Sequence, residues 1–375
     1  MRGMYLSAGA VSLRPSVVLA ARTYSQLIKN EFSWSFSRHN IFSECQRKYW
    51  FHYYGAWNGW PRRRGCPPRV PSMLYAMKHY VSLDQLVGTI VHRSLQQYFD
   101  IFLRRGTSQA AWTDVKKEAR NMLQRSCENT IAAMQGKRPL PKHSNVVLEA
   151  MIPLQGARIL EHTEAEDTLR ESLGPAIHSA SERIQDCLDS FWASELNEVV
   201  LKEKNIEVIF NGELQSSTYY VCENDIKIYF AVDLALRHEG VPIFLDWTTN
   251  PHENSDLLHA QLTLYDYLTK AKGKVADDED SVLCSFDLSS GKMKLYEHDR
   301  STDSLEGALS DSVSRMKETL VQGDFYQNSM DLDQAIPTED HTKCALCPFQ
   351  HVCSSTRFGK LSLSMLKDVE EKYQL

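Results

Sequence analysis

The sequence has no apolar run that approaches the ~20 residues needed to cross a bilayer. It also has no convincing secretory signal, no internal repeat and no extended low-complexity segment. Its nine cysteines are odd in number and show no paired pattern, so a disulfide framework is not expected. These absences predict a cytoplasmic protein that is not integral to a membrane.

Acidic residues are absent from the first 30 positions, whereas Arg2, Arg14, Arg22 and Lys29 are present. This composition is compatible with a transit peptide, and equally with a flexible leader or with a start codon assigned too far upstream. We expect residues 1–36 to be such a leader.

Acidic residues are also absent from Gln46 to Leu83. This stretch carries seven positive charges, at Arg47, Lys48, Arg62, Arg63, Arg64, Arg69 and Lys78, interleaved with nine tyrosine, tryptophan and phenylalanine residues. Basic groups neutralise phosphates and aromatic faces stack on unpaired bases. The segment therefore predicts nucleic-acid contact, with Arg47, Lys48, Arg62, Arg63 and Arg64 as candidate residues. The alternative is a solvated basic loop over an aromatic core.

The chain is long enough, at 375 residues with 42% hydrophobic content, to bury a large core in one elaborated domain or two. Hydrophobic periodicity predicts an α/β order of helices, strands and helices. Helices are expected at 40–54, 84–106, 108–134, 165–197, 254–271 and 303–321, and strands within 204–248 and at 281–287 and 292–297. The prolines between 61 and 71 predict a loop.

Four cysteines suggest that the two ends of the chain meet. Cys344, Cys347 and Cys353 form a C-x2-C-x5-C triplet, and no cysteine near them can complete a set of four. Cys45, which lies among aromatic and basic residues, is the favoured remote partner. Four converging thiolates are typical of a metal or iron–sulfur site. A structural zinc site or a set of buried thiols stays open as the alternative.

Two aspartates flank the tight turn H-E-G-V. If Glu239 and Gly240 are its centre, Asp233 and Asp246 face each other in an antiparallel pair. Opposed residues share one face with Cβ atoms roughly 4.5–5.5 Å apart, so both carboxylates can hold one hard divalent cation. The alternative is two unrelated exposed aspartates.

Thr248 projects from the same strand face as Asp246, at a position where a cation beside the reacting phosphate would be useful. Threonine brings no charge. Lys227 belongs to a predicted strand that runs from Ile226 through Leu236. It is roughly 20 Å from Asp233 along that strand, too far to supply the positive charge that Thr248 lacks. Lys292 or Lys294 on a later strand is the remaining candidate.

Taken in order, these pieces resemble the PD-(D/E)XK nuclease superfamily, in particular its RecB-like branch with an iron–sulfur cluster, which includes CRISPR-associated adaptation nucleases and AddB-type nuclease domains. The matching pieces are S-R-H-N-I-F-S-E-C-Q-R-K-Y, G-T-I-V-H ending at His92, V-D at Asp233, D-W-T-T at Asp246, Q-L-T-L-Y from Gln261 to Tyr265, and the cysteine triplet. They extend from residue 37 to residue 353. Thr248 departs from the family pattern, which has lysine there.

The resemblance implies a site for Mg2+ or Mn2+ built from His92, Asp233, Asp246 and the backbone carbonyl of Trp247. Gln261 and Tyr265 match the motif that organises such a site and contacts the nucleic acid. Cys45, Cys344, Cys347 and Cys353 match the ligands of a 4Fe-4S cluster that serves as a structural brace. Without the family pattern, His92 reads as an ordinary hydrogen-bonded histidine on an amphipathic helix.

The expected fold is a restriction-endonuclease-like core with a central mixed sheet flanked by helices. After the leader at 1–36 we expect a single nuclease-like domain at 37–353 and a tail at 354–375. Within the domain, residues 37–106 hold N-terminal helices and the basic loop, 107–200 a helical lobe, 201–322 the core, and 323–353 the cysteine segment.

The leading hypothesis is a metal-dependent nuclease that cleaves single-stranded or end-opened DNA in repair, recombination or mobile-element defence. A second hypothesis is a catalytically weak or silent DNA-binding member of the same fold, because Thr248 replaces the usual lysine. A third is a zinc-stapled structural protein.

Overall fold

The computed structural model describes residues 29–61, 68–106, 108–136, 145–152, 162–202, 206–212, 219–221, 226–250, 255–297, 302–321 and 330–353. The helices are α1 (Phe36–Glu44), α2 (Gln46–Trp50), the π-helical turn η1 (Phe51–Gly55), α3 (Arg69–Met77), α4 (Leu83–Arg105), α5 (Gln109–Met134), α6 (Leu148–Met151), α7 (His162–Trp192), α8 (Glu195–Lys202), α9 (Ser255–Ala271), α10 (Thr302–Glu318) and the 3-10 turn η3 (His341–Cys344). The strands are β1 (Ser33–Ser35), β2 (Tyr80–Val81), β3 (Val146–Val147), β4 (Glu207–Phe210), β5 (Tyr219–Val221), β6 (Lys227–Tyr229), β7 (Leu234–His238), β8 (Val241–Thr248), β9 (Val282–Asp287) and β10 (Lys292–Tyr296).

The central sheet has the strand order β10-β9-β8-β7-β4 and is mixed, because β8 and β9 are parallel whereas the other neighbours are antiparallel. The fold is therefore the mixed α/β arrangement that the sequence predicts. Two smaller sheets accompany it, one of order β1-β6-β5 and one that pairs β2 with β3. Among the described residues, no helix is both long and apolar enough to cross a membrane.

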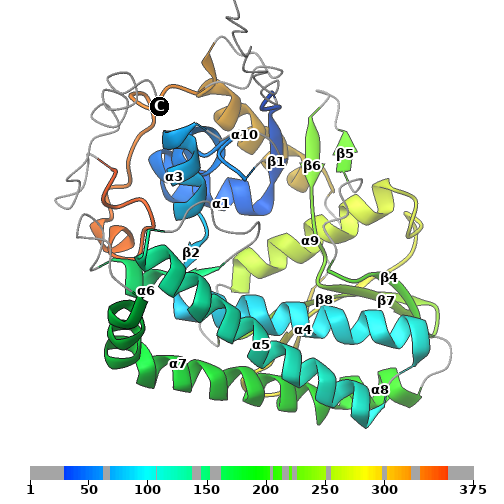
Figure 1. Cartoon of the computed structure of the whole chain (residues 1–375). Helices are drawn as coiled ribbons and strands as arrows, with labels where there is room; N and C mark the ends of the chain where they lie inside the picture. The colour runs from blue at the N-terminus through cyan, green and yellow to red at the C-terminus, as the bar shows by residue number, and fades with distance from the viewer. Residues whose placement is uncertain are drawn as a thin grey trace, which may run out of the picture.

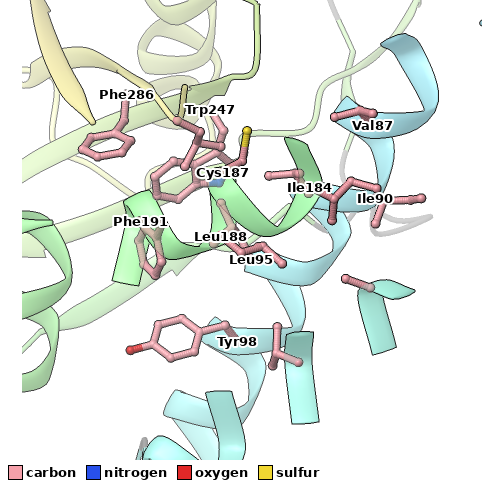
Figure 2. Packing of buried hydrophobic residues seen from close by; sticks show 14 of the residues in the cluster. Val87, Ile90, Leu95, Tyr98, Ile184, Cys187, Leu188, Phe191, Trp247 and Phe286 are labelled. Atoms are coloured by element: carbon pink, nitrogen blue, oxygen red, sulfur yellow. The ribbon is translucent and has the colours of Figure 1, made fainter. Parts of the chain in front are cut away.

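One face of the central sheet packs against α4 and α7, and α5 packs on both of these helices (Figure 1). Figure 2 shows the contact: Trp247 of β8 and Phe286 of β9 lie against α7, and the rings of Phe191 and Trp247 are 5.5 Å apart. The amphipathic stripe of α4, including Val87 and Ile90, is buried in the same cluster. Leu245 and Trp247 of β8 therefore belong to a buried core, and Ile243 packs at its edge.

The opposite face of the central sheet packs against α9 (Figure 1). Phe244 of β8 and Leu283 of β9 face each other across the parallel pair and join Leu262 and Leu268 of α9 in a second buried cluster. Because side chains alternate along a strand, Asp246 and Phe244 share this face. The pleat thus places the candidate carboxylate between the sheet and α9.

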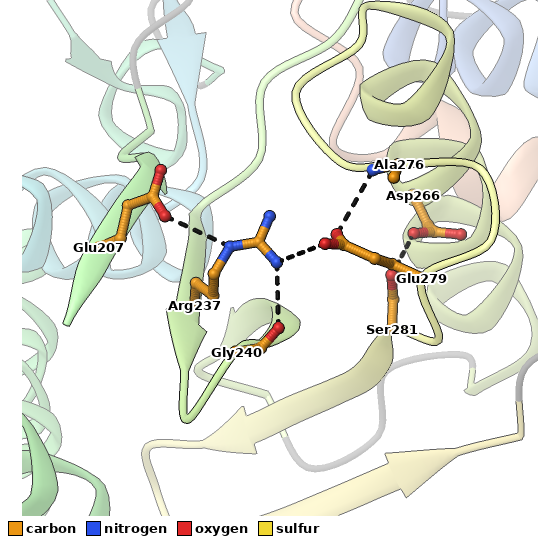
Figure 3. Close-up of polar contacts among 7 residues, drawn as sticks. All are labelled: Glu207, Arg237, Gly240, Asp266, Ala276, Glu279 and Ser281. Carbon is orange, nitrogen blue, oxygen red and sulfur yellow. Dashed lines mark hydrogen bonds and ion pairs between the residues drawn. The ribbon is translucent and has the colours of Figure 1, made fainter. Parts of the chain in front are cut away.

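Arg237 ties the β7–β8 hairpin to its surroundings (Figure 3). Its Nε donates to Glu207 of β4 at 3.3 Å, and its Nη1 donates to the Gly240 carbonyl at 3.0 Å and to Glu279 at 2.9 Å. Glu279 also accepts from the backbone N–H of Ala276, in the loop that follows α9. One guanidinium therefore fixes the turn that sets the register of the candidate site.

Replacing Arg237 by methionine should lower the free energy of unfolding by about 1 kcal/mol. The change keeps the aliphatic stem but removes three hydrogen bonds, whose ionic part is screened by solvent. Urea denaturation measures the loss, which should shrink at high salt. Arg170→Met is the matched control, because Arg170 is 73% exposed and 3.7 Å from Asp167. Equal effects of the two variants would contradict this role for Arg237.

Two expectations for the N-terminal third were wrong. The predicted helix at 40–54 is interrupted at Cys45, whose extended backbone (φ −165°) ends α1 and begins α2. The predicted loop through residue 71 ends earlier, because α3 begins at Arg69 with Pro71 in its first turn. Proline is tolerated there, since the first helical N–H groups have no intrahelical partner.

The segment predicted as one strand from Ile226 through Leu236 forms two strands in different sheets. β6 pairs in parallel with β1, with Ser33 opposite Lys227, whereas β7 belongs to the central sheet. Lys227 therefore lies in a different strand from the one that follows Asp233, and its ammonium lies 2.6 Å from Glu31. The β1 pairing joins residues far apart in the sequence, so local periodicity does not reveal it.

Candidate active site

Asp233 and Asp246 lie together at the open end of the β7–β8 hairpin. Glu239 and Gly240 have φ of 49° and 84°, as a two-residue type I′ turn requires. Leu234 pairs with Leu245, which is the register that this turn predicts. Asp233 directly precedes β7, and its Oδ2 accepts from the Trp247 backbone N–H at 3.1 Å. The Asp233 carboxylate is thus held beside Asp246 by the backbone of β8, the strand that carries Asp246.

Asp246 is buried, with 6% of its surface exposed, and contacts α9. Gln261 donates through Nε2 to Asp246 Oδ1 at 3.1 Å and to the Tyr265 hydroxyl at 2.8 Å. Burial, followed by the charges of Asp246 and Asp233, raises the pKa of Tyr265 well above its usual value. Tyr265 therefore stays protonated, and its hydroxyl lies within electrostatic reach of both carboxylates.

His92 reaches the same site from α4. Its Nδ1 is 3.0 Å from Asp233 Oδ2, and the imidazole is about one-third exposed. Gly88 lies one turn earlier on the helix, where an added Cβ would be 3.2 Å from Thr249 Oγ1. The small residue lets α4 pass close to the end of β8, which brings His92 to the hairpin.

Thr248 lies at the end of β8 and is buried, with 6% of its surface exposed. It pairs with Asp287 of β9, and its carbonyl accepts from the Leu288 N–H at 2.8 Å. The side chain at this position is therefore uncharged and held by the sheet.

Lys292 and Lys294 lie on β10, two strands from the aspartates. Lys294 pairs with Ser285, which pairs with Asp246, so the three share one row of the sheet. Two strand spacings separate the outer pair by about 9–10 Å. The Lys294 ammonium donates to the Ser255 hydroxyl at the start of α9, and Lys292 is exposed. The Lys294 side chain is thus held at the start of α9 in this arrangement.

The two carboxylates at the hairpin fit a hard divalent cation by their chemistry, since carboxylate oxygens are suitable ligands for Mg2+ and Mn2+, and the imidazole of His92 is a softer donor that suits Mn2+ better than Mg2+. Two carboxylates close to one point also favour a cation between them. In the described segments, however, no group of three or more histidine, cysteine, aspartate or glutamate residues is arranged to hold a metal ion. His92 and Asp233 instead contact each other directly.

The cysteine-bearing segments lie against each other. Trp50 Nε1 donates to the Met330 carbonyl at 2.7 Å, and the rings of Phe51 and Phe349 stack with centroids 5.2 Å apart. Cys45 is the N-cap of α2, where its Sγ accepts from the Lys48 N–H at 3.4 Å. The N-terminal helices and residues 330–353 are thus held together by ordinary packing and hydrogen bonds.

Cys45, Cys344, Cys347 and Cys353, which we call the cysteine clasp, are free thiols. Burial, with a smaller contribution from Cys45 and Cys353, raises the pKa of Cys347 to about 12. Burial and the same two neighbours also raise the pKa of Cys344. The thiols therefore share one neighbourhood and are soft donors of the kind that iron–sulfur clusters and zinc use, although they are not arranged as a metal site.

Arg47 and Lys48, predicted as nucleic-acid contacts, have structural partners. Arg47 donates through its backbone N–H to Ile336 and through Nε to Ala335, at 3.3 and 3.1 Å. Lys48 is 2.8 Å from Glu44, one helical turn earlier. These contacts tie α2 to the C-terminal segment.

The other predicted contacts in this segment, Arg62, Arg63 and Arg64, lie outside the described residues.

Comparison with known proteins identifies the family of the chain. No curated protein matches the chain significantly. The solved structure described as "Crystal structure of SSO0001" is similar to this chain with a TM-score of 0.28 and 13% sequence identity. The match covers 64% of this chain and 97% of that one, and a TM-score this low does not show a shared fold. A family model described as the PD-(D/E)XK nuclease superfamily matches residues 33–354, which include every residue of the hairpin site and the clasp. The chain belongs to the PD-(D/E)XK nuclease superfamily.

Proposed function

We propose that the protein is a metal-dependent nuclease that hydrolyses phosphodiester bonds in single-stranded or end-opened DNA, in repair, recombination or mobile-element defence. The observation that carries the proposal is the convergence of Asp233, Asp246 and His92 at the end of one hairpin, within a chain that belongs to a nuclease superfamily. Members of this superfamily commonly use Mg2+ or Mn2+ and act on DNA.

His92, Asp233, Asp246 and the Trp247 carbonyl would hold the cation. When bound, it supplies a Lewis acid for the scissile phosphate and lowers the pKa of water. Gln261 orients Asp246 by donating to one carboxylate oxygen, and Tyr265 holds the Gln261 amide by accepting from it. The Trp247 N–H positions Asp233 in the same way. These contacts pre-organise the carboxylates before substrate arrives.

A second function is favoured by one observation, the uncharged Thr248 at the buried position where the superfamily pattern has lysine. In this reading the protein binds DNA and cuts it weakly or not at all. The two functions share a fold and a DNA surface, so only cleavage distinguishes them.

Thr248→Lys should raise the rate of DNA cleavage at least about tenfold, because a cation beside the developing phosphate charge stabilises the transition state. The assay is digestion of labelled single- and double-stranded DNA with Mg2+ or Mn2+. Thr248→Met is the control for added length without charge. Metal-dependent cleavage by the parent supports the nuclease, whereas binding without cutting, rescued or not by lysine, favours the binding module.

We further propose that Cys45, Cys344, Cys347 and Cys353 ligate a 4Fe-4S cluster, as in the RecB-like branch. The raised pKa values of Cys344 and Cys347, to which the neighbouring Cys45 and Cys353 contribute, and the packing of the segments that carry the four residues support this assignment. The cluster would act as a brace within a single domain at 37–353, with the leader before it and the tail after it.

A further inference from the structure

Lys294 of β10 presents a cation on the same face of the central sheet as the candidate site. It occupies one row of the sheet with Ser285 and Asp246, because each of these residues pairs with the next across neighbouring strands. Residues opposed in this way point to the same side of the sheet. Lys294 and Asp246 therefore both face α9, with two strand spacings, or about 9–10 Å, between them.

The first two turns of α9 contact both ends of this row. Ser255 accepts from the Lys294 ammonium, and Gln261 donates to Asp246 Oδ1 at 3.1 Å. Ser255 and Gln261 are separated by about 9 Å along the helix axis, at 1.5 Å per residue. The helix thus covers the same distance as the row, and it links the carboxylate site to the outermost described strand of the central sheet.

Tyr296 helps to hold the Lys294 side chain in this position. The Lys294 ammonium lies 4.9 Å from the centre of the Tyr296 ring, and the His259 ring of α9 stacks on that of Tyr296 with centroids 5.4 Å apart. The Tyr296 hydroxyl is 3.2 Å from Ser285 Oγ, and His259 Nε2 is 2.7 Å from the Glu297 carbonyl oxygen. The ring that lies beside the ammonium is therefore itself fixed to β9 and α9.

These contacts orient the charge of Lys294 without neutralising it. Within the described segments, its ammonium contacts the neutral Ser255 hydroxyl and the Tyr296 ring, and no carboxylate, and the residue is exposed. Lys270 of the same helix differs, because it pairs with Asp266 at 3.0 Å. Ordering a lysine side chain costs conformational entropy. An exposed cation that is ordered in advance, in the same row as a candidate phosphodiester site, is suited to bind a phosphate.

We propose that Lys294 binds a backbone phosphate adjacent to the scissile one and so positions the nucleic-acid strand across Asp246. The separation of two strand spacings favours an adjacent phosphate, because the scissile phosphate belongs at the carboxylates. Lys294 is therefore a substrate-binding residue and does not replace the charge that Thr248 lacks. The inference rests on the proposed function for the place of the scissile bond, but its binding test does not require cleavage.

Binding is tested by fluorescence anisotropy of a labelled oligothymidylate of about 20 nucleotides, with EDTA present so that no metal-dependent cleavage contributes. Each phosphate contact on a single strand adds about 0.7 to the slope of log affinity against log salt. Lys294→Gln should lower this slope by about 0.7 and weaken binding about tenfold. Lys294→Arg should retain both the slope and the affinity, because the guanidinium keeps the charge.

Two variants separate the charge of Lys294 from its contact with α9. Ser255→Ala removes the hydroxyl that holds the ammonium but removes no charge, so the salt slope should stay at the parental value. Lys274→Gln, at an exposed lysine beyond the other end of α9, controls for the loss of one surface charge and should not change binding. Circular dichroism and thermal melting verify that each variant is folded. Equal losses of affinity in Ser255→Ala and Lys294→Gln, both with the parental slope, would show a structural role and overturn the proposal.

Cleavage kinetics give a second readout in a parent that cuts DNA. Lys294→Gln should raise KM about tenfold and change kcat by less than about threefold, because the contact is made equally in the bound substrate and in the transition state. A parent that binds the oligonucleotide without cutting it would contradict the nuclease and leave the salt-slope test of Lys294 in force. A folded Lys294→Gln protein with parental affinity and salt slope would overturn the inference even if the parent cleaves DNA, and a parent that does not bind the oligonucleotide would overturn both.

Discussion

Asp246→Asn should reduce metal-dependent DNA cleavage by at least about a thousandfold, because it removes the negative charge that would hold the cation. Asparagine has nearly the same shape, and its Oδ1 can still accept from Gln261. The contact between β8 and α9 should therefore persist. Single-turnover cleavage of labelled DNA measures the loss, and thermal melting should show a folded protein.

Asp266→Asn is the matched control for this substitution. Asp266 is also a buried carboxylate on the α9 side of the sheet, where it accepts from Ser281 at 2.6 Å (Figure 3). It also pairs with Lys270 at 3.0 Å. The change should lower stability and leave the cleavage rate per folded molecule unchanged. An Asp246→Asn protein that cuts DNA as well as the parent would exclude Asp246 from the proposed site.

The carboxylate pair could be predicted from the sequence because its geometry is local. Glu239 and Gly240 specify the turn, the turn specifies the register, and the register places Asp233 beside Asp246. The Gln261 contact follows less directly, since it depends on how α9 packs on the sheet. The metal-ligating roles of these residues stay predictions.

The contact between Arg38 and Tyr53 could not be predicted from the sequence, because it depends on how η1 packs against α1. Lys78 and Tyr75 lie one turn apart at the end of α3, so their contact follows once α3 is known to be a helix. The prolines between 61 and 71 predict a loop where α3 begins, and this hides the helix.

The central sheet was predictable in outline, since β7, β8, β9 and α9 are long and strongly patterned. The small sheet was not, because β1 is three residues long and pairs with β6 far away in the sequence. Short strands that pair over a long separation carry almost no periodic signal. Tertiary pairing, rather than local propensity, decided where the segment from Ile226 through Leu236 divides.

Cys45→Ser should abolish the proposed cluster while leaving α2 capped. Serine is a favourable N-cap and can accept from the Lys48 N–H as Cys45 Sγ does, so the substitution isolates ligation from capping. Protein purified anaerobically should fall from about four irons per chain to fewer than one, with loss of the broad absorbance near about 400 nm. Because ligation contributes folding free energy, stability should fall by on the order of 3 kcal/mol or more.

Cys127→Ser is the control, because Cys127 is a half-buried thiol on α5 and should affect neither iron content nor colour. A colourless parent with about one zinc per chain would replace the cluster by a structural zinc site. The remaining outcome is a parent protein that contains neither metal and has the same stability as Cys45→Ser. That result would contradict the cluster and show that the stacked Phe51–Phe349 rings and the Trp50–Met330 hydrogen bond are sufficient to hold the two ends together. Packing alone can do so only if burial of these aromatic groups outweighs the cost of ordering the segments that carry them, which is why metal content and stability must be measured on the same preparation.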